Sequence, residues 1–366
     1  IAEIYIEETK KRGLECFYSY RLNEMLEKNG EQDDMPPDWL IPGEWDQPLV
    51  NFAVPEVRQK KVAYCRELVE RYNFDGIEMD FARGTLLTPA GQQWALRGHV
   101  TRFLYEVRQT TLEVARQRGR PVLIAVRVPN CLVGCRFDGL DVLTWLELNL
   151  ADLIVLGVRS LELEVESFKQ LIGDRPVQVL ATLDDHHCSD GYSWPPIEVW
   201  RGAATNWWAQ GVDAIQTFNW GVAPPALAAR FGLRFRGAYD EGGRQIPVYR
   251  QAYRELGAAD GLRYKDKHFV VQRRGGGGSG GADIDQWVTP RHNYQNTNML
   301  GQLPASVDLS GRVDTLVQLR VGQDLAADGD RIAQLTLRLL LSDGTPQRET
   351  GGTCGRPGEC SVDQPV

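Results

Sequence analysis

The strongest constraint on this chain is a repeated alternation of short apolar runs with helical segments. Residues 121–128, PVLIAVRV, form a nearly continuous apolar run, which is typical of a parallel strand covered on both faces. Comparable runs follow helical segments at 15–20, 71–81, 152–157, 177–183 and 213–220. Six strands that alternate with helices in one direction predict a parallel sheet.

A TIM barrel is favoured over a doubly wound sheet. A doubly wound nucleotide fold would place a glycine fingerprint between its first strand and helix, whereas these strands end in polar or aromatic residues, as at the carboxyl face of a barrel. Residues 1–12 are predicted to form a helix with no strand before it, so the six strands are interpreted as strands three to eight. The fold class is therefore predicted to be α/β, a (β/α)8 TIM barrel that is N-terminally incomplete.

The character of the sequence changes near residue 270. Residues 274–281, RGGGGSGG, are a flexible linker by composition, and beyond them apolar residues largely alternate with period two, as in antiparallel strands. We predict a barrel domain at 1–270, a glycine-rich linker at 271–282, a small β-sandwich-like antiparallel module at 283–345 and a disordered or truncated tail at 346–366.

Composition narrows the classes of partner. The 366 residues include 41 lysine or arginine and 49 aspartate or glutamate, and the resulting charge of −8 repels phosphate backbones, so no nucleic acid partner is expected. No run approaches the apolar length that a membrane-spanning helix needs.

The seven cysteines are too few for a disulfide scaffold. Local bridges could close between Cys131 and Cys135 and between Cys354 and Cys360, and free thiols are the equal alternative.

Residues 75–80, DGIEMD, place two carboxylates on one face of a predicted strand. Side chains alternate along a strand, so Glu78 and Asp80 point together and their neighbours face the helices. Carboxylates inside a barrel are costly unless they are paired or used. We expect Glu78 to lie deep in an ion pair with Arg127 of the next strand, and Asp80, nearer the carboxyl end, to be catalytic.

Four segments resemble the glycosyl-hydrolase-like-10 group of TIM-barrel proteins. They are GLECFYSYRLN at 13–23, VPEVR at 54–58, YNFDGIEMD at 72–80 and WAQGVDAIQTFN at 208–219. The resemblance spans residues 1 to 255 and implies a glycoside hydrolase that acts on polysaccharide, is usually exported and carries a small C-terminal β-module. Related sequences end a strand in several glycosidase clans, where the last aspartate, here Asp80, is often catalytic.

Glycoside hydrolysis needs a second carboxyl group as acid, base or nucleophile. Candidates at other strand ends are Asp184 and Asp185, after the strand at 177–183, and Glu162, after the strand at 152–157, with a solvated loop position as the alternative for each. Asp184 and Asp185 rank ahead because the adjacent His186 and His187 could orient them or tune their pKa.

Side chains suited to sugar recognition follow the predicted strands. Forked donors and amides match sugar hydroxyls, and an indole matches the apolar face of a sugar. The predicted substrate-binding residues are Arg21, Asn23, Glu78, Arg127, Asn130, His186, Asn219 and Trp220. Neutralising the inner carboxylates is an equally good and compatible role for the two arginines.

No metal and no cofactor is predicted. The run at 184–188, DDHHC, contains only ligand-type residues, but consecutive residues rarely converge on one ion and no matching pair stands elsewhere at zinc-site spacing. Residues 277–281, GGSGG, match a nucleophile-elbow pattern without its flanking strand and helix, so they are interpreted as linker.

The sequence therefore predicts an enzyme, a glycoside hydrolase that cleaves a polysaccharide or oligosaccharide by paired-carboxylate acid–base chemistry. One alternative is a non-catalytic carbohydrate-binding or scaffold barrel, which would lack the second facing carboxylate. Another is a metal-dependent barrel hydrolase that uses Asp80, Asp184 and His186. The geometry of the site separates these hypotheses.

Overall fold

The computed structural model describes residues 1–23, 35–41, 48–82, 86–157, 161, 163–184, 197–218, 248–267, 334–340, 346–356 and 359–360. The chain divides into two compact units. The first unit contains residues 1–157 and 163–182, and the second contains residue 161 together with the described segments from residue 183 onward.

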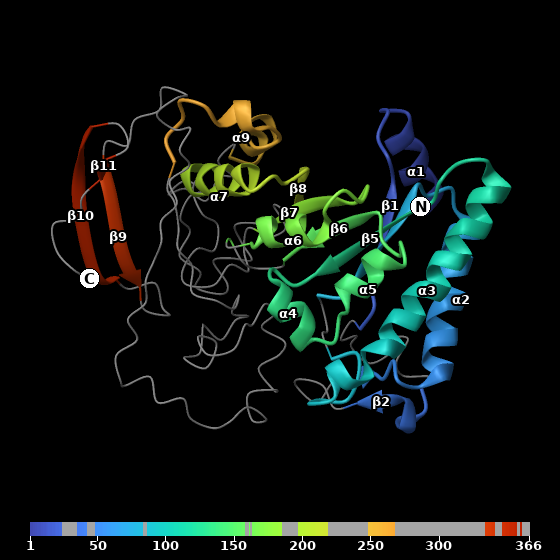
Figure 1. Ribbon diagram of the computed structural model, residues 1–366. Coiled ribbons are helices and arrows are strands. Elements are labelled where there is room, and N and C mark those ends of the chain that lie inside the picture. The colour runs from blue at the N-terminus through green and yellow to red at the C-terminus, as the bar shows by residue number, and fades with distance from the viewer. Residues whose placement is uncertain are drawn as a thin grey trace, which may run out of the picture. The chain divides into compact units, whose positions relative to one another are not determined.

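Between residues 55 and 255, helices and strands largely alternate along the described chain (Figure 1). In order they are α1 (Ala2–Lys10), β1 (Phe17–Arg21), the 3-10 turn η2 (Pro37–Trp39), β2 (Leu40–Ile41), β3 (Leu49–Val50), α2 (Pro55–Arg71), β4 (Gly76–Asp80), α3 (Gln93–Arg118), β5 (Leu123–Val128), α4 (Leu132–Phe137), α5 (Val142–Glu147), β6 (Leu153–Leu156), α6 (Val165–Ile172), β7 (Gln178–Asp184), α7 (Ile197–Ala209), β8 (Ala214–Phe218), α9 (Val248–Glu255) and the 3-10 turn η4 (Ala259–Leu262). Strands β9 (Gln334–Leu340), β10 (Pro346–Arg356) and β11 (Glu359–Cys360) follow.

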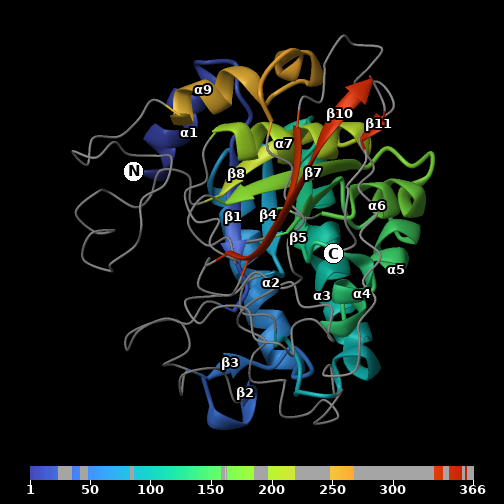
Figure 2. The ribbon, with the colours of Figure 1, turned by 90° about the vertical axis from the view of Figure 1, so that its left-hand side faces the viewer.

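Six strands form one sheet in the order β1-β4-β5-β6-β7-β8. The pairings from β1 through β7 are parallel, and Figure 2 shows β1, β4 and β5 next to one another. The predicted α/β class and parallel sheet are confirmed, with a strand at each of the six predicted places. No further strand of this sheet is among the described residues, so closure into an eight-stranded barrel stays a prediction.

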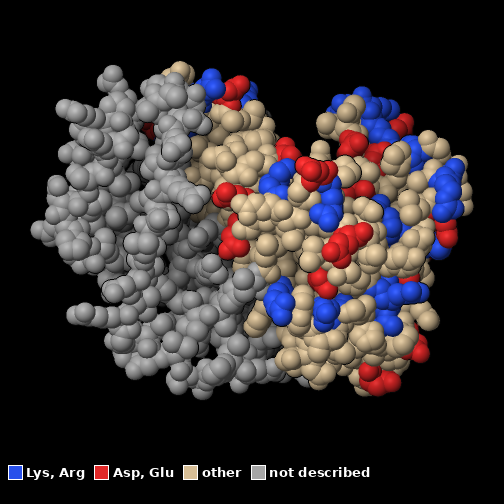
Figure 3. Space-filling view, in the orientation of Figure 1, with Lys and Arg blue, Asp and Glu red and all other residues tan. Residues whose placement is uncertain are grey.

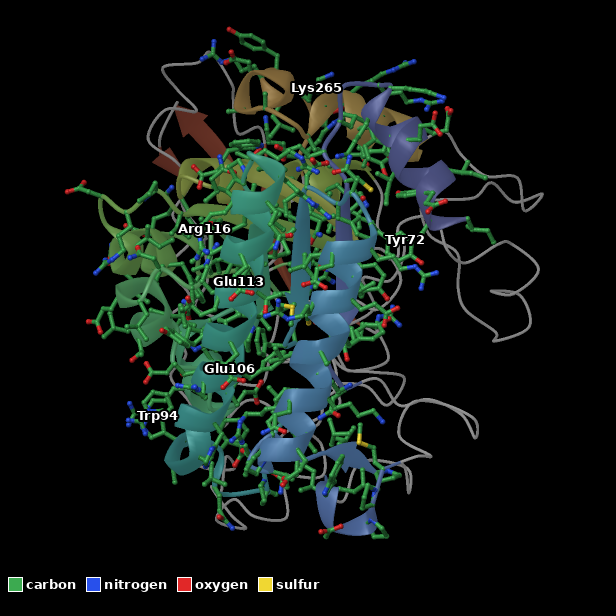
Figure 4. All side chains as sticks on the ribbon, turned by 90° about the vertical axis from the view of Figure 1, so that its right-hand side faces the viewer. Tyr72, Trp94, Glu106, Glu113, Arg116 and Lys265 are labelled. Carbon is green, nitrogen blue, oxygen red and sulfur yellow. The ribbon has the colours of Figure 1, made fainter. Side chains whose placement is uncertain are left out.

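Helices α2 and α3 lie side by side in the first unit (Figure 4). Pro55 starts α2, where its fixed backbone suits the first turn, and Gly119 ends α3 in the left-handed conformation with φ of 66°. Both helices bury one stripe of side chains at three- and four-residue steps, among them Val57 and Cys65 of α2 and Phe103 of α3. Each large apolar side chain buried in this way stabilises the fold by about 2 kcal/mol.

Between β1 and α2 the chain forms a hairpin that the sequence analysis does not predict. Strand β2 pairs with β3 in antiparallel register, with Leu40 opposite Val50 and Ile41 opposite Leu49. The two strands have two residues each, too few for an alternation pattern to show in the sequence.

The C-terminal strands form a three-stranded antiparallel sheet in the order β11-β10-β9. Residues 346–356 and 359–360, which the sequence analysis assigned to a disordered or truncated tail, are strands of this sheet. Strand β10 has no apolar alternation, but its backbone pairs with β9 from Pro346 to Thr353, and backbone hydrogen bonds need no apolar side chains. The predicted domain boundaries at 270 and 282 lie outside the described residues, as does the segment 283–333.

The described surface mixes both signs of charge. Figure 3 shows acidic and basic side chains interspersed over the described part of one face. Exposed ion pairs one turn apart, such as Arg71 with Glu67 on α2, are part of this pattern. Within the described ranges, no helix combines the length and the apolar character needed to cross a bilayer.

Candidate active site

Strand β4 carries both predicted carboxylates, and all five of its residues are buried. It lies between β1 and β5, whose registers align Ser19 with Glu78, Arg21 with Asp80, and Asp80 with Arg127. Side chains of residues opposite one another point to the same face of a sheet. One row at the end of β4 therefore contains Arg21, Asp80 and Arg127, and the row two residues earlier contains Ser19 and Glu78.

Glu78 and Arg127 form a buried ion pair. Arg127 Nη2 lies 2.8 Å from Glu78 Oε1, and the two side chains are only 2% and 5% exposed. The hydroxyl of Ser19 donates a second hydrogen bond, 2.6 Å long, to the same oxygen. The predicted pairing of Glu78 with Arg127 is confirmed. Removing one partner of such a pair leaves a buried charge without compensation, which costs about 3–5 kcal/mol.

Asp80 has a different environment at the end of the same strand. It is 1% exposed, its Oδ1 accepts a 3.1 Å hydrogen bond from the backbone N–H of Ala82, and its Oδ2 lies 3.9 Å from Arg127 Nη1. Burial is the largest influence on its pKa and raises it. The positive charge of Arg127 lowers the Asp80 pKa, and the negative charge of Glu78 raises it. The charge of Arg21 and the hydrogen bond from the Ala82 N–H also lower it, but the net shift of the Asp80 pKa is upward.

The two carboxyl groups therefore differ in their share of Arg127. Its guanidinium makes a 2.8 Å hydrogen bond to Glu78, whereas its distance to Asp80 is beyond hydrogen-bond range. The positive charge is held mainly by Glu78, so it offsets the burial of Asp80 only in part. A raised pKa favours the protonated form of the Asp80 carboxyl group, and a general acid must hold a proton that it can donate.

Asn23 has a structural position. It is fully buried, and its amide nitrogen donates to the carbonyl oxygens of Leu86 at 2.8 Å and Val50 at 3.3 Å. Its amide oxygen accepts from the N–H of Val50 at 2.8 Å. This side chain links three backbone groups of the segments around β3 and residue 86. This structural role is an alternative to the predicted contact of Asn23 with a sugar.

Arg21 and Asn130 lie at strand ends, as predicted. Arg21 is the last residue of β1 and half-buried, and its charge lowers the pKa of Asp80. Asn130 is buried two residues after β5, and its carbonyl oxygen accepts a 3.0 Å hydrogen bond from the N–H of Glu164.

The second carboxyl group is not placed by the described residues. Asp184 is the last residue of β7, and its side chain is outside what the structure describes. Five other predicted residues also lie outside the described ranges, namely Glu162, Asp185, His186, Asn219 and Trp220. Their roles stay predictions.

Ser19 is the site residue that the sequence analysis missed. Its hydroxyl contacts the carboxylate that also binds Arg127. The alternation along FYSYR, residues 17–21, puts Ser19 on the same face as Arg21, and that pattern alone could have identified it.

The described residues contain no group of three or more His, Cys, Asp or Glu side chains arranged as a metal site. The run at 184–188 falls almost wholly beyond them. The metal-dependent hypothesis, which needs His186, is therefore not tested by the described residues.

Comparison with known proteins finds no matching profile of a protein family and no matching curated protein. Several solved structures of glycoside hydrolases are similar in part. The glycoside hydrolase domain of PelA from Pseudomonas aeruginosa is 13% identical over 59% of this chain and 83% of that chain, with a TM-score of 0.40. An alpha-amylase from Geobacillus thermoleovorans is 14% identical over 71% of this chain and 60% of that chain, with a TM-score of 0.44. The overlap is too slight to carry over a substrate or a catalytic residue, and membership of the glycosyl-hydrolase-like-10 group stays a prediction.

Proposed function

We propose that this chain is a glycoside hydrolase in which Asp80 supplies one of the two catalytic carboxyl groups. The observation that carries the proposal is that Arg127 of β5 lies closer to Glu78 than to Asp80, the two carboxyl groups of β4. Glu78 is neutralised by a 2.8 Å ion pair, whereas Asp80, two residues later, is buried with a raised pKa. Two titratable groups with environments this different are typical of an acid–base site.

In this proposal Asp80 is the general acid. It holds a proton and transfers it to the glycosidic oxygen as the bond to the leaving sugar breaks. Arg127 and Glu78 are positioning residues, because Ser19 holds the Glu78 carboxylate and Glu78 holds the guanidinium that faces Asp80. The second carboxyl group, from Asp184, Asp185 or Glu162, serves as base or nucleophile.

The substrate is a polysaccharide or oligosaccharide, and no cofactor takes part. Sugar hydroxyls and the apolar sugar face contact the remaining predicted residues, Arg21, Asn130, His186, Asn219 and Trp220. The proposal includes export from the cytoplasm and membership of the glycosyl-hydrolase-like-10 group, both of which rest on the resemblance of the DGIEMD strand and its companion segments.

The test is a polysaccharide-panel assay on the parent chain, Asp80→Asn and a matched control, Asp75→Asn. Asp75 lies one residue before β4, at the opposite end of the strand from Asp80. We expect hydrolysis of at least one glycan by the parent, loss of that activity in Asp80→Asn, and retention in Asp75→Asn. Full activity of Asp80→Asn would overturn the assignment.

A second candidate function is a non-catalytic carbohydrate-binding barrel. The 1% exposure of Asp80 favours it, because a structural carboxylate needs no access to substrate. In that case the parent binds a glycan from the panel without cleaving it, and Asp80→Asn leaves that binding unchanged.

A further inference from the structure

Cys354 of β10 lies directly opposite Cys360 of β11 in antiparallel register. Residues opposite each other in such a pair have Cα atoms about 4.5 or 5.5 Å apart. A disulfide joins residues whose Cα atoms are about 4.4–6.8 Å apart. The register therefore brings the two positions within disulfide range without a change of backbone.

Two cross-strand pairs are described for the backbone of the hairpin that carries these cysteines. Its described pairs are Cys354 with Cys360 and Arg356 with Glu359, and the extra residue Gly355 forms a bulge between them. Strand β11 has two residues, so few backbone hydrogen bonds hold it to β10. A covalent link restricts the unfolded chain, and its effect on order is large where other interactions are few.

We propose that Cys354 and Cys360 form an intrachain disulfide that closes the β10–β11 hairpin. The oxidant is a small disulfide of the glutathione class. One cysteine thiolate attacks glutathione disulfide and releases one glutathione, and the second cysteine thiolate then displaces the other glutathione from the mixed disulfide. Both S–H bonds are lost, one S–S bond forms, and one glutathione disulfide becomes two glutathione thiols.

The other described cysteines do not compete for this reaction. Cys16, Cys65, Cys131 and Cys135 are buried and are not joined by a disulfide in the described residues, so the local bridge between Cys131 and Cys135 considered from the sequence is not formed. Burial raises the pKa of the Cys16 and Cys135 thiols and lowers their thiolate fraction. The remaining cysteine, Cys188, lies outside the described residues and is handled by a control variant.

The sequence provides a direct assay. Cleavage after glutamate cuts at Glu349 and Glu359 and separates Cys354, in the peptide 350–359, from Cys360, in the peptide 360–366. The full chain is incubated with glutathione disulfide, its remaining thiols are blocked with iodoacetamide, and it is digested at mildly acidic pH to suppress exchange. We expect a mass for the two peptides joined, loss of alkylation at both cysteines, and separation of the peptides after reduction.

Two variants make the result specific. Cys188→Ser keeps the joined peptides, and Cys354→Ser abolishes them and leaves Cys360 open to alkylation or to a mixed disulfide with glutathione. Alkylation of both cysteines in oxidised parent chain would overturn the proposal, as would a link from either cysteine to Cys188 or to a second chain. The readout needs no glycan hydrolysis, so its failure is distinct from a failure of the proposed function.

Discussion

An aspartate lies at each end of β4, and the pKa values of the two are shifted in opposite directions. Asp75, just before the strand, lies 3.0 Å from Lys10 Nζ and 2.8 Å from Arg120 Nη1, and accepts a 2.9 Å hydrogen bond from the Cys16 N–H. Burial raises its pKa, but these three partners lower it, and the net direction is downward. At the other end, burial dominates and the pKa of Asp80 is raised.

In the proposed function, this difference assigns stability to one end of the strand and chemistry to the other. Asp75 joins α1 and the start of β1 to β4, and its charged form is stabilised by the fold. For Asp80 the net shift is upward, which favours the protonated form of its carboxyl group. Residues at the amino ends of barrel strands generally serve stability, and those at the carboxyl ends serve the site. The variants below test that contrast, from the largest expected effect to the smallest.

Asp80→Asn should lower kcat by a factor on the order of 10² to 10⁴, because the amide cannot exchange the catalytic proton. The thermal stability of this variant, in contrast, should not fall. A raised folded-state pKa means that stability is present below the unfolded pKa and lost as pH rises through the folded pKa. The amide abolishes that loss, so the variant should melt no lower than the parent at neutral pH. A clearly lower Tm would contradict the raised pKa.

Glu78→Gln should destabilise the chain by about 3–5 kcal/mol, since it leaves the buried Arg127 without its charge partner. Urea unfolding at neutral pH measures this. Ser19→Ala is the milder control, because it removes one hydrogen bond and leaves the ion pair intact. If Glu78→Gln is inactive yet as stable as the parent, the roles of Glu78 and Asp80 are reversed.

Glu255 in the second unit extends the comparison to a third carboxylate. Burial raises its pKa, but hydrogen bonds from Arg201, Lys265 and Gln251 lower it from 4.5 to about 2. This stability is present above the unfolded pKa and lost as pH falls from about 4.5 towards 2, a total of about 3 kcal/mol. Unfolding of the parent and Glu255→Gln across that range should show the pH dependence in the parent and little of it in the variant.

Asp75→Asn should cost about 1–2 kcal/mol, because two ion pairs with partly exposed partners are weakened. Because the folded-state pKa of Asp75 is lowered, its ionised form stabilises the parent at pH values above the unfolded pKa. The free energies of unfolding of the variant and the parent should therefore converge as the pH falls through the folded pKa. Turnover on any glycan that the parent cleaves should stay within twofold. A large drop in kcat would remove the distinction between the two ends of β4.

Glu67→Gln on α2 should have the smallest effect, below about 0.5 kcal/mol. Its partner Arg71 lies one helical turn away, and both side chains are 63% exposed, so water and salt screen the ion pair. Urea unfolding of this variant measures how much a solvated carboxylate contributes to the free energy of unfolding. A cost as large as that of Asp75→Asn would show that the contacts of Asp75 with Lys10 and Arg120 stabilise the fold no more than an exposed ion pair does.

Periodicity along the sequence predicted the six strands of the parallel sheet, helix α2 and one of the site's contacts. The apolar run at 121–128 predicts β5, and Pro55 with the stripe that follows predicts α2, because these patterns are properties of consecutive residues. The ion pair of Glu78 with Arg127 could also be predicted, since alternation assigns a face and the two strands are neighbours in the sheet.

Only the tertiary structure decided how those residues are used. The side chain of Asn23 forms hydrogen bonds with the backbone of Val50 and Leu86, and the sequence around Asn23 does not indicate these partners. Strand β10 forms because its backbone pairs with β9, and the sequence of β10 does not indicate that pairing. The raised pKa of Asp80 likewise depends on burial and on an arginine that Glu78 holds more closely. Burial, register and the sharing of a charge are relations between distant segments, so no pattern within one segment contains them.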